Sequence, residues 1–496
     1  MLLLGIDIGT SSIKVAVTDA QTGQCIGTAQ FPDDTETGII AVQSGWAEQS
    51  PEMWWQHVQQ AILKANASGK YNPSDIGAIG IAYQMHGLVL VDAQQQVLRN
   101  SIIWCDSRAV EIGAKANKAI GETKTLAHLL NAPGNFTASK LAWVKANEPE
   151  VYKRIDKIML PGDFIAMKLT GEISTSISAL SEGIFWDFKN NQLSDDIFNY
   201  FGFDKKIIPA IQPVFSAHGN VKAAIANSLL LQPGIPVTYK AGDQPNNALS
   251  LNVLEPGEVA ATAGTSGVIY GVSDALTFDP QSRVNTFAHV NYTTEKIRTG
   301  VLLCINGTGI LNRWVKNSFS PAADYKAMNE AASKIPAGAE GLSILPFGNG
   351  AERMLGNKMI GAQMQGIDLN LHTQAHIIRA AQEGIAFSFR YGLDIMRENG
   401  MHPKVIRAGK ANLFLSNVFA QAFVDVTNTP VELYECDGSV GASVGAGMGA
   451  GVYTSAKEAF SNTKPLQLIE PSAAASAYDG FYKQWNEILI KQLSGS

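Results

Sequence analysis

The chain has 496 residues, of which 46% are hydrophobic, 17% charged and 8% aromatic. This composition is ordinary for a folded globular protein and excludes a disordered chain. The formal net charge is −6 and no basic block occurs in the sequence, which argues against a nucleic-acid binder and against a membrane-surface protein. A chain of this length exceeds what one hydrophobic core usually organises, so we expect two large domains with a cleft between them.

The cysteines show no C-x-x-C spacing, which argues against a zinc site or a disulfide framework. They are Cys25, Cys105, Cys304 and Cys436. Met1 leads directly into an apolar run, without the charged leader and cleavage site of a secreted protein, so we expect a cytoplasmic address. Chemistry on a small molecule fits these features better than binding to a macromolecule or a membrane.

The first element in chain order is an expected hairpin over residues 2–17, in which two apolar runs flank a Gly-containing turn. Backbone N–H groups of this turn and the hydroxyls of Thr10 and Ser11 can bind phosphate oxygens, because Gly9 lets another group approach the backbone closely. Asp7 can hold a hydrated cation beside them. The alternative is an ordinary tight turn, and no Walker A string is present.

A polar cluster then ends an apolar strand. After a helix that begins at Ser50-Pro51-Glu52, a strand is expected over residues 76–82, and it stops at Tyr83-Gln84-Met85-His86-Gly87. In alternating α/β architecture, ligands bind at such strand ends. Met85 and His86 are therefore candidate ligand-binding residues.

A second strand end carries an acid and a base. Residues 102–104 are apolar and lead to Asp106 and Arg108. This pair can face the same rim as the first cluster, but the alternative is a salt bridge at a helix start, since Asp is a good N-cap residue. Residues 173–187 are polar and then aromatic, and pattern alone assigns no chemistry to them.

A strand over residues 234–242 ends in Gly-Asp, which makes Asp243 the first candidate for a catalytic residue. We place the domain boundary near residue 245, giving domains of residues 1–244 and 245–496, because a fresh set of strands and turns follows. That set contains the loop Gly264-Thr265-Ser266, which is similar to the opening loop. Two such loops, one early in each half, suggest two similar domains facing each other.

The second half continues with a helix start near Gly307 and a long helix over residues 373–399. Residues 405–412 read as a strand, a Gly turn and a helix start, which suits the adenosine or phosphate part of a nucleotide. The Gly-rich segment 437–451 is too short to span a membrane. We expect it to form a buried helix packed against the nucleotide loops.

Taken in order, these motifs resemble the FGGY family of carbohydrate kinases, and most closely its xylulokinases, over essentially the whole chain. The resemblance is carried by Gly5-Ile6-Asp7-Ile8-Gly9-Thr10-Ser11, Trp46-Ala47-Glu48-Gln49, Gln84-Met85-His86-Gly87, Trp104 with Asp106 and Arg108, Gly242-Asp243-Gln244, and Gly264-Thr265-Ser266-Gly267. It implies two ribonuclease-H-like domains of the actin and hexokinase type, closing on ATP and a sugar.

The resemblance also implies roles for single residues. Asp243 would be the general base for phosphorylation of a ketopentose, most simply D-xylulose at its terminal hydroxyl, and Asp7 would hold Mg²⁺ through water. The sugar site would comprise Met85, His86, Asp106, Asp243 and Gln244. The nucleotide site would comprise Gly9, Thr10, Ser11, Gly264, Thr265, Ser266, Gly307, Gly409, Lys410 and Asn412.

The sequence departs from the family pattern at three segments, which are residues 174–181, 349–353 and 407–411. A kinase for ribulose, gluconate or erythritol is therefore an alternative, and a nucleotide-dependent switch without kinase activity is another. The presence of Asp243 at a strand end speaks against the switch. Apart from the sugar and ATP we expect no nucleic-acid or membrane partner, and a homodimer is left open.

Overall fold

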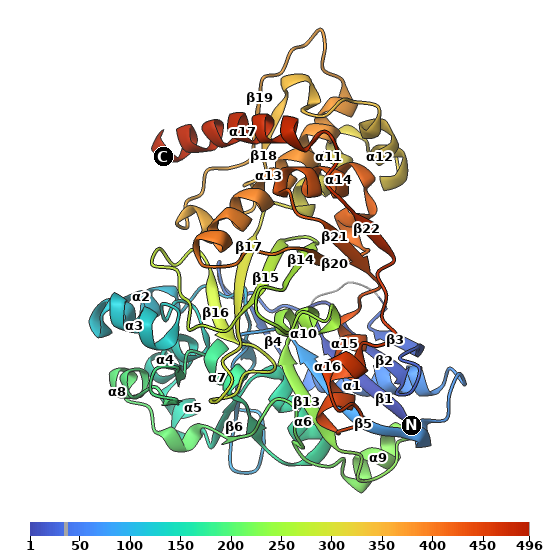
Figure 1. Ribbon diagram of the computed structural model, residues 1–496. Helices are drawn as coiled ribbons and strands as arrows, with labels where there is room; N and C mark the ends of the chain where they lie inside the picture. The colour runs from blue at the N-terminus through green and yellow to red at the C-terminus, as the bar shows by residue number, and fades with distance from the viewer. Residues whose placement is uncertain (34–37, 496) are drawn as a thin grey trace.

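The computed structural model describes residues 1–33 and 38–495, and its two halves form a lower and an upper body in Figure 1. The lower body is built on a five-stranded sheet with the order β13-β5-β1-β2-β3. These strands are β1 (Leu2–Ile8), β2 (Ile13–Asp19), β3 (Cys25–Phe31), β5 (Ile76–Tyr83) and β13 (Val237–Gly242).

The opening hairpin is confirmed, since β1 pairs antiparallel with β2 around the turn between Ile8 and Ile13. β5 and β13 add to the sheet in parallel with β1, so the C-terminal ends of all three strands meet at one edge. Helix α1 (Pro51–Asn66) starts where expected, because Ser50 accepts a hydrogen bond from the Met53 N–H. Its buried apolar side packs against β2 and β3.

The segment between β5 and β13 adds a set of short helices to the first half. They are α2 (Val110–Ile120), α3 (Glu122–Leu129), α4 (Thr137–Asn147), α5 (Pro149–Lys153), α6 (Pro161–Thr170), α7 (Ile177–Glu182), α8 (Asp195–Phe201) and α9 (Ala223–Leu229). Helix α6 contacts β5, β13 and α1, so α1 and α6 cover the same face of the sheet.

The upper body is built on a seven-stranded sheet with the order β16-β17-β15-β14-β20-β21-β22. Its strands are β14 (Val259–Ala263), β15 (Gly267–Ser273), β16 (Asn285–Ala288), β17 (Thr299–Ile305), β20 (Ile406–Gly409), β21 (Val431–Tyr434) and β22 (Gln467–Ile469). The helices beside it are α11 (Gly309–Phe319), α12 (Tyr325–Ser333), α13 (Gln374–Glu398), α14 (Asn417–Thr427) and α17 (Ala475–Gly495). The expected long helix is therefore confirmed as α13.

One apolar cluster joins the two halves. It contains Met85 and Leu180 from the first half together with Tyr270, Phe287 and Leu302 from the strands of the second sheet. The second sheet thus contacts the first half through side chains of its own strands. This contact brings Phe287 of β16 against His86, which follows β5.

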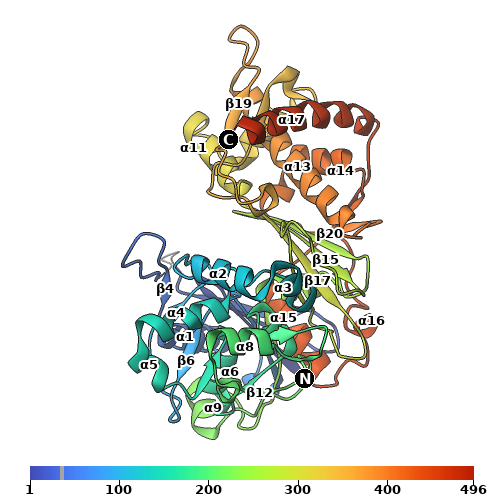
Figure 2. The ribbon, with the colours of Figure 1, turned by 90° about the vertical axis from the view of Figure 1, so that its left-hand side faces the viewer.

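Helix α15 (Gly438–Gly449) is confirmed as a buried helix; it packs on the first sheet, and its first residue, Gly438, lies beside Asp7 of the opening motif. It contacts β1, β5 and β13, on the opposite face from α1 and α6, and Figures 1 and 2 show it in the lower body far from α17. The helix lies directly on the sheet because Gly80 of β5 presents no side chain: a Cβ there would stand 2.0 Å from the carbonyl oxygen of Ala442.

The predicted division near residue 245 falls inside α10 (Asp243–Ser250), which follows β13 without a break. The division stays a proposal. It is not a clean separation along the chain, because α15 of the second half packs on the first sheet. Among the residues described, no helix is long and apolar enough to cross a bilayer.

Candidate active site

Three strand ends gather the acids and the polar residues that the sequence singled out. Asp7 is near the end of β1, Met85 and His86 follow β5, and Asp243 follows β13 as the first residue of α10. Because β1, β5 and β13 are parallel, these residues lie at one edge of the sheet, the usual place for ligands in α/β proteins.

Burial sets the proton affinity of both aspartates at this edge. It raises the pKa of Asp243 to about 7, Asp7 adds to the effect, and hydrogen bonds from Gln244 act in the opposite direction. Burial also raises the pKa of Asp7 to about 6, with a further contribution from the negative charge of Asp437. A carboxyl group with a pKa near neutrality is suited to accept a proton from a substrate at physiological pH.

His86 is held in a constrained position. Its φ of 63° is in the left-handed region, and the buried Lys140 of α4 donates a hydrogen bond of 2.8 Å to its carbonyl oxygen. Its ring packs against Phe136 and Phe287 at centroid distances of 4.8 and 5.5 Å. The backbone strain and the buried ammonium group together mark a residue whose position is fixed by its surroundings.

The protonation of His86 follows from its contacts. Burial, followed by the charge of Lys140, lowers its pKa to about 3, so the imidazole is neutral at pH 7. Nδ1 lies 3.1 Å from the carbonyl oxygen of Glu182. Since a carbonyl oxygen can only accept, Nδ1 carries the proton, and Nε2 is left as a hydrogen-bond acceptor.

Gly242 allows two side chains to converge in front of Asp243. A Cβ at this position would stand 2.6 Å from Met85 Cγ and 2.8 Å from Glu182 Oε2. The thioether of Met85 and the carboxyl group of Glu182 therefore lie side by side next to the residue that precedes Asp243.

The Asp106 carboxylate is hydrogen-bonded to groups of the protein itself, as the salt-bridge alternative predicts. Its carboxylate accepts hydrogen bonds from the Arg108 side chain and, at 2.6 Å, from the Ala47 N–H. The Arg108 guanidinium also reaches Glu48 and stacks on Trp46, with 3.8 Å to the ring centroid. A direct contact of Asp106 with the sugar stays a prediction, and these bonds give it a structural part in holding the rim.

The opening loop is tied to its neighbours through Thr10. The Thr10 hydroxyl donates to Gln84 Oε1 and accepts from the Trp104 indole, at 3.2 and 3.0 Å, and Gln49 donates to the Thr10 carbonyl. The loop is thereby positioned by residues at the ends of other elements. The Ser11 hydroxyl has no such bond among the described residues, so it is the more available of the two for a phosphate group.

A pocket of about 390 Å³ lies in the second half, and three of the predicted nucleotide residues, Gly264, Thr265 and Asn412, line it. Its remaining lining comes from the end of β14, from α11 and α12, and from the segment after β20, and comprises Ala263, Gly309, Asn312, Arg313, Tyr325, Asn329, Leu413, Leu415 and Ser416. The loop between β14 and β15 is fixed there because the Gly309 N–H donates to the Gly264 carbonyl at 3.0 Å.

Four predicted nucleotide residues of the second half do not line this pocket. Ser266 belongs to the same loop, and Gly409 ends β20. Lys410 is exposed. The Gly307 N–H donates to the buried Glu352 carboxylate at 3.1 Å, which fixes the turn between β17 and α11. Gly307 therefore helps to hold the turn that precedes the pocket-lining helix α11.

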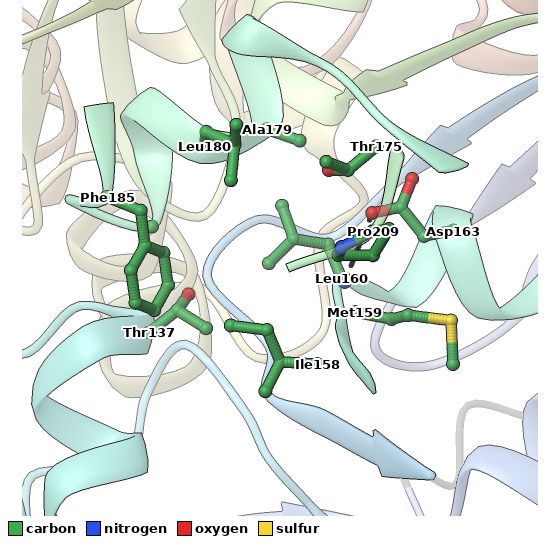
Figure 3. Close-up of a pocket in the computed structure, with 11 residues that line it drawn as sticks. Thr137, Ile158, Met159, Leu160, Asp163, Thr175, Ala179, Leu180, Phe185 and Pro209 are labelled. Atoms are coloured by element: carbon green, nitrogen blue, oxygen red, sulfur yellow. Dashed lines mark hydrogen bonds between the residues drawn. The ribbon is translucent and has the colours of Figure 1, made fainter. Parts of the chain in front are cut away.

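Figure 3 shows a different hollow, inside the first half, which has no part in this site. It holds only about 20 Å³, the space of a single water, and its labelled side chains, such as Leu160, Leu180 and Phe185, are mostly apolar. None of the predicted site residues lines it.

The described residues contain no group of three or more His, Cys, Asp or Glu side chains that could hold a metal ion. Magnesium in phosphoryl-transfer enzymes needs only one or two carboxylates, because phosphate oxygens and waters complete its shell. Asp7, partly buried and close to the charges of Asp437 and Asp243, presents oxygen donors of this kind.

Pattern reasoning missed two residues beside His86, namely Glu182 and Lys140, as well as Tyr325 and Asn329 at the second-half pocket. Glu182 lies in the segment to which no chemistry was assigned. The one available signal was a charged residue among apolar neighbours in a short helix, and such residues also occur at surfaces.

Solved structures match this fold over almost its full length. A xylulose kinase from Rhodospirillum rubrum has a TM-score of 0.87 at 25% identity, covering 99% of both chains. A glycerol kinase from Plasmodium falciparum, solved with ADP, has a TM-score of 0.88 at 20% identity, covering 99% of this chain and 98% of the other, and bears on the fold alone. The fold and the clustered strand ends thus define a two-domain phosphotransferase of the actin and hexokinase type.

Residues 2–250 match the N-terminal domain of the FGGY family of carbohydrate kinases, and residues 259–452 match its C-terminal domain. The chain belongs to this family, whose members transfer a phosphoryl group from ATP to an alcohol group of a carbohydrate. A xylulose kinase of Bacillus subtilis (strain 168) is 29% identical over 437 residues, 86% of this chain and 84% of the relative. One of Escherichia coli (strain K12) is 27% identical over 448 residues, 89% of this chain and 87% of the relative.

Proposed function

We propose that this carbohydrate kinase phosphorylates a ketopentose, D-xylulose, at its terminal hydroxyl to give D-xylulose 5-phosphate. The observation that carries the proposal is the convergence of Met85 and His86 with Asp243 at one sheet edge. The curated relatives quoted above are named xylulose kinases, which supports the choice of substrate.

Asp243 would act as the general base. As the sugar oxygen forms its bond to the γ-phosphorus, the bond from that phosphorus to the ADP oxygen breaks, and the hydroxyl proton passes to the Asp243 carboxylate. Such transfer leaves little covalent work for the protein, so positioning and charge neutralisation dominate. The pKa of Asp243, raised by burial to about 7, keeps a useful fraction of the base unprotonated at neutral pH.

Met85 and His86 would select the sugar. The thioether packs against a carbon skeleton, and the Nε2 of the neutral imidazole accepts a hydrogen bond from a hydroxyl. A site built to bond a hydroxyl discriminates strongly against a molecule that lacks it. The ring is held for this task by Phe136 and Phe287.

The nucleotide would lie between the two Gly-Thr-Ser loops, residues 9–11 and 264–266. Its base would lie in the 390 Å³ pocket of the second half. Asp7 would hold magnesium through water, and the ion would supply neutralisation of phosphate charge. Ser11 and Thr265 would donate to phosphate oxygens.

The test is a coupled assay of ADP release with a panel of pentuloses, polyols and sugar acids, followed by phosphorus NMR of the product. D-xylulose should give the highest kcat/KM and a single phosphate ester at the terminal position, and activity should require magnesium. A higher kcat/KM for ribulose, gluconate, glycerol or erythritol would replace the substrate, and ADP release that no acceptor stimulates would refute the kinase assignment.

A further inference from the structure

Glu182 is the last residue of α7, and that helix is firmly attached to the second half. The Ser178 hydroxyl donates to the Ala288 carbonyl at 2.8 Å, and the Ala288 N–H donates to the Ser181 hydroxyl at 2.9 Å. Ala288 ends β16, so α7 is held against a strand of the second sheet. A residue on such a support keeps its position well.

The carboxyl group of Glu182 is buried, with only 2% of the residue exposed, yet it is poorly satisfied. Oε1 accepts one long hydrogen bond of 3.5 Å from the His86 N–H. Oε2 accepts none from the part of the chain that the structure describes, and no Lys or Arg there forms an ion pair with it. Burial therefore raises the pKa of Glu182 well above its ordinary value, and Asp243 and Asp163 add to the effect against Lys140.

Such a group is costly for the folded state, because only one long hydrogen bond offsets the removal of the carboxyl group from water. The position also offers no compensation from the helix, since an acid at a C-terminal end is repelled by the helix dipole. Stability alone gives no reason for this residue, which is a reason to look for a ligand.

The location of Oε2 indicates which ligand. It stands beside Met85 in front of Gly242, 2.8 Å from where a Cβ of that glycine would be, and Gly242 directly precedes Asp243. The same residue also fixes the His86 tautomer through its carbonyl oxygen. Glu182 Oε2 therefore lies beside Met85 and next to the residue that precedes Asp243.

We propose that Glu182 binds a hydroxyl of the sugar through Oε2 and is a specificity-determining residue of the acceptor site. This inference rests on the proposed function, because it takes the substrate to be a polyhydroxylated acceptor in front of Asp243. A carboxyl group whose pKa is raised by burial holds its proton more readily, and in that form it can donate as well as accept, whereas His86 Nε2 can only accept. The two residues therefore distinguish two hydroxyls by the direction of their hydrogen bonds, and an epimer with one hydroxyl inverted loses one of these bonds.

The experiment compares Glu182→Ala and Glu182→Gln with the wild type and with Asp187→Asn. Asp187 is a suitable control, since it is a buried acid only five residues further on, but it is paired with His128 at 2.9 Å and bonded to Asn190. The measurements are kcat and KM for D-xylulose and for its 3- and 4-epimers, KM for ATP, D-xylulose binding by calorimetry without nucleotide, and thermal unfolding.

For Glu182→Ala we expect kcat/KM for D-xylulose to fall about 10-fold or more, with a larger loss for D-xylulose than for the epimers and a KM for ATP within about 2-fold of the wild type. Glu182→Gln keeps a donor and an acceptor and should recover most of the loss. Both variants should unfold at or above the wild-type temperature, because each removes a buried carboxyl group that has only one long hydrogen bond. Asp187→Asn should lower the unfolding temperature and leave the discrimination among sugars unchanged.

The inference is overturned if the Glu182 variants unfold at a lower temperature but retain wild-type binding and discrimination, or if all sugars lose the same factor. The proposed function fails separately, when the wild type itself neither binds nor phosphorylates any pentulose. In that case the same comparison, made with the acceptor that the wild type does use, decides the role of Glu182.

Discussion

Burial acts on Asp243 and His86 in opposite directions, although the two residues share one edge of one sheet. It raises the pKa of the acid to about 7 and lowers that of the base to about 3. At neutral pH the site therefore offers a carboxylate that can take a proton and an uncharged imidazole that can only accept a hydrogen bond through Nε2. Both properties arise from the same low-dielectric surroundings.

Replacement of the base tests the first of these roles. Asp243→Asn should lower kcat by ~10²-fold or more, because the amide cannot accept the hydroxyl proton, while ATP binding and the unfolding temperature stay close to the wild type. In the wild type, kcat/KM for the sugar should decrease as the pH falls below about 7, where Asp243 becomes protonated. Steady-state kinetics over a pH series measures both, and turnover like the wild type in Asp243→Asn would remove this residue from the mechanism.

Replacement of the imidazole tests the second role. His86→Ala should cost kcat/KM for D-xylulose about 1 to 3 kcal/mol, the scale of one unpaired buried hydrogen-bond partner, with little change in KM for ATP. His128→Ala is the matched control, because that histidine pairs with Asp187. If His86→Ala is less stable but still discriminates among pentuloses as the parent does, His86 has a structural role only.

At this scale the sequence was informative where a polar residue directly ends an apolar strand. Asp243 and His86 were found in this way, and the structure brings them to one edge. Asp106 was found by the same rule, yet its oxygens bind Arg108 and Ala47. A strand end places a side chain at a rim but does not say which partner it meets, and Glu182 and Lys140 come from helices whose packing no local pattern encodes.

Among the elements, α15 depends on the absence of side chains between it and the first sheet. Gly80→Ala should lower the free energy of unfolding by about 1 to 3 kcal/mol or more, because the new Cβ would stand 2.0 Å from the backbone oxygen of Ala442 and a backbone atom cannot move aside cheaply. Gly480→Ala in α17 is the control: nothing lies within 4 Å there, and the helix should gain stability. Urea unfolding followed by circular dichroism compares them, and equal effects would contradict close packing of α15.

The turn between β17 and α11 rests on one buried acid. The Glu352 carboxylate accepts hydrogen bonds from the Asn306 and Gly307 N–H groups at 3.0 and 3.1 Å, and burial raises its pKa from 4.5 to about 7. Because the folded state holds this proton more tightly than the unfolded state, the associated stability is present below pH 4.5 and is lost as the pH rises through about 7.

Relative to Glu352→Gln, which cannot titrate, the wild type should therefore lose about 2.5 kcal/mol of unfolding free energy between pH 5 and pH 8. Denaturant unfolding of both proteins at four pH values gives this difference directly. Parallel pH curves for the two proteins would show that Glu352 titrates normally.

Element types were predictable from periodicity, and element partners were not. The hairpin at residues 2–17, α1 and α13 appear where their apolar spacing indicated. The Gly-rich stretch of α15 was recognised as a close-packed helix, but small residues are compatible with any flat surface, so the pattern could not name the first sheet as its partner.

At the scale of the whole molecule, the Asn131 side chain joins the two halves by forming two hydrogen bonds with the backbone of a strand edge. Its side chain donates to the Thr286 carbonyl at 2.6 Å and accepts from the Thr286 N–H at 3.0 Å, so it pairs with the edge of β16. The next residue, Phe287, packs on the His86 ring. The strand that Asn131 holds against the first half is thus the same strand that places Phe287 on the His86 ring.

Asn131→Ala should lower the free energy of unfolding by about 1 to 3 kcal/mol, because two backbone groups of Thr286 lose their partner, and should raise KM for D-xylulose several-fold with little effect on KM for ATP. Asn147→Ala is the control, since among the described residues that side chain bonds to Trp143 alone, within its own helix. An unchanged sugar KM in a destabilised Asn131→Ala protein would show that β16 does not shape the acceptor site.

The return of α15 to the first sheet also sets an order of events during synthesis. At 5 to 20 residues per second, β1 leaves the ribosome roughly 20 to 90 s before the helix that must cover it. Throughout that interval the face of the sheet around Gly5 and Gly80 has no cover, so the nascent first half cannot finish folding as an independent unit. A ribosome that stops before residue 438 releases a chain with an open sheet face, which is a substrate for chaperones and proteases rather than a stable half-enzyme.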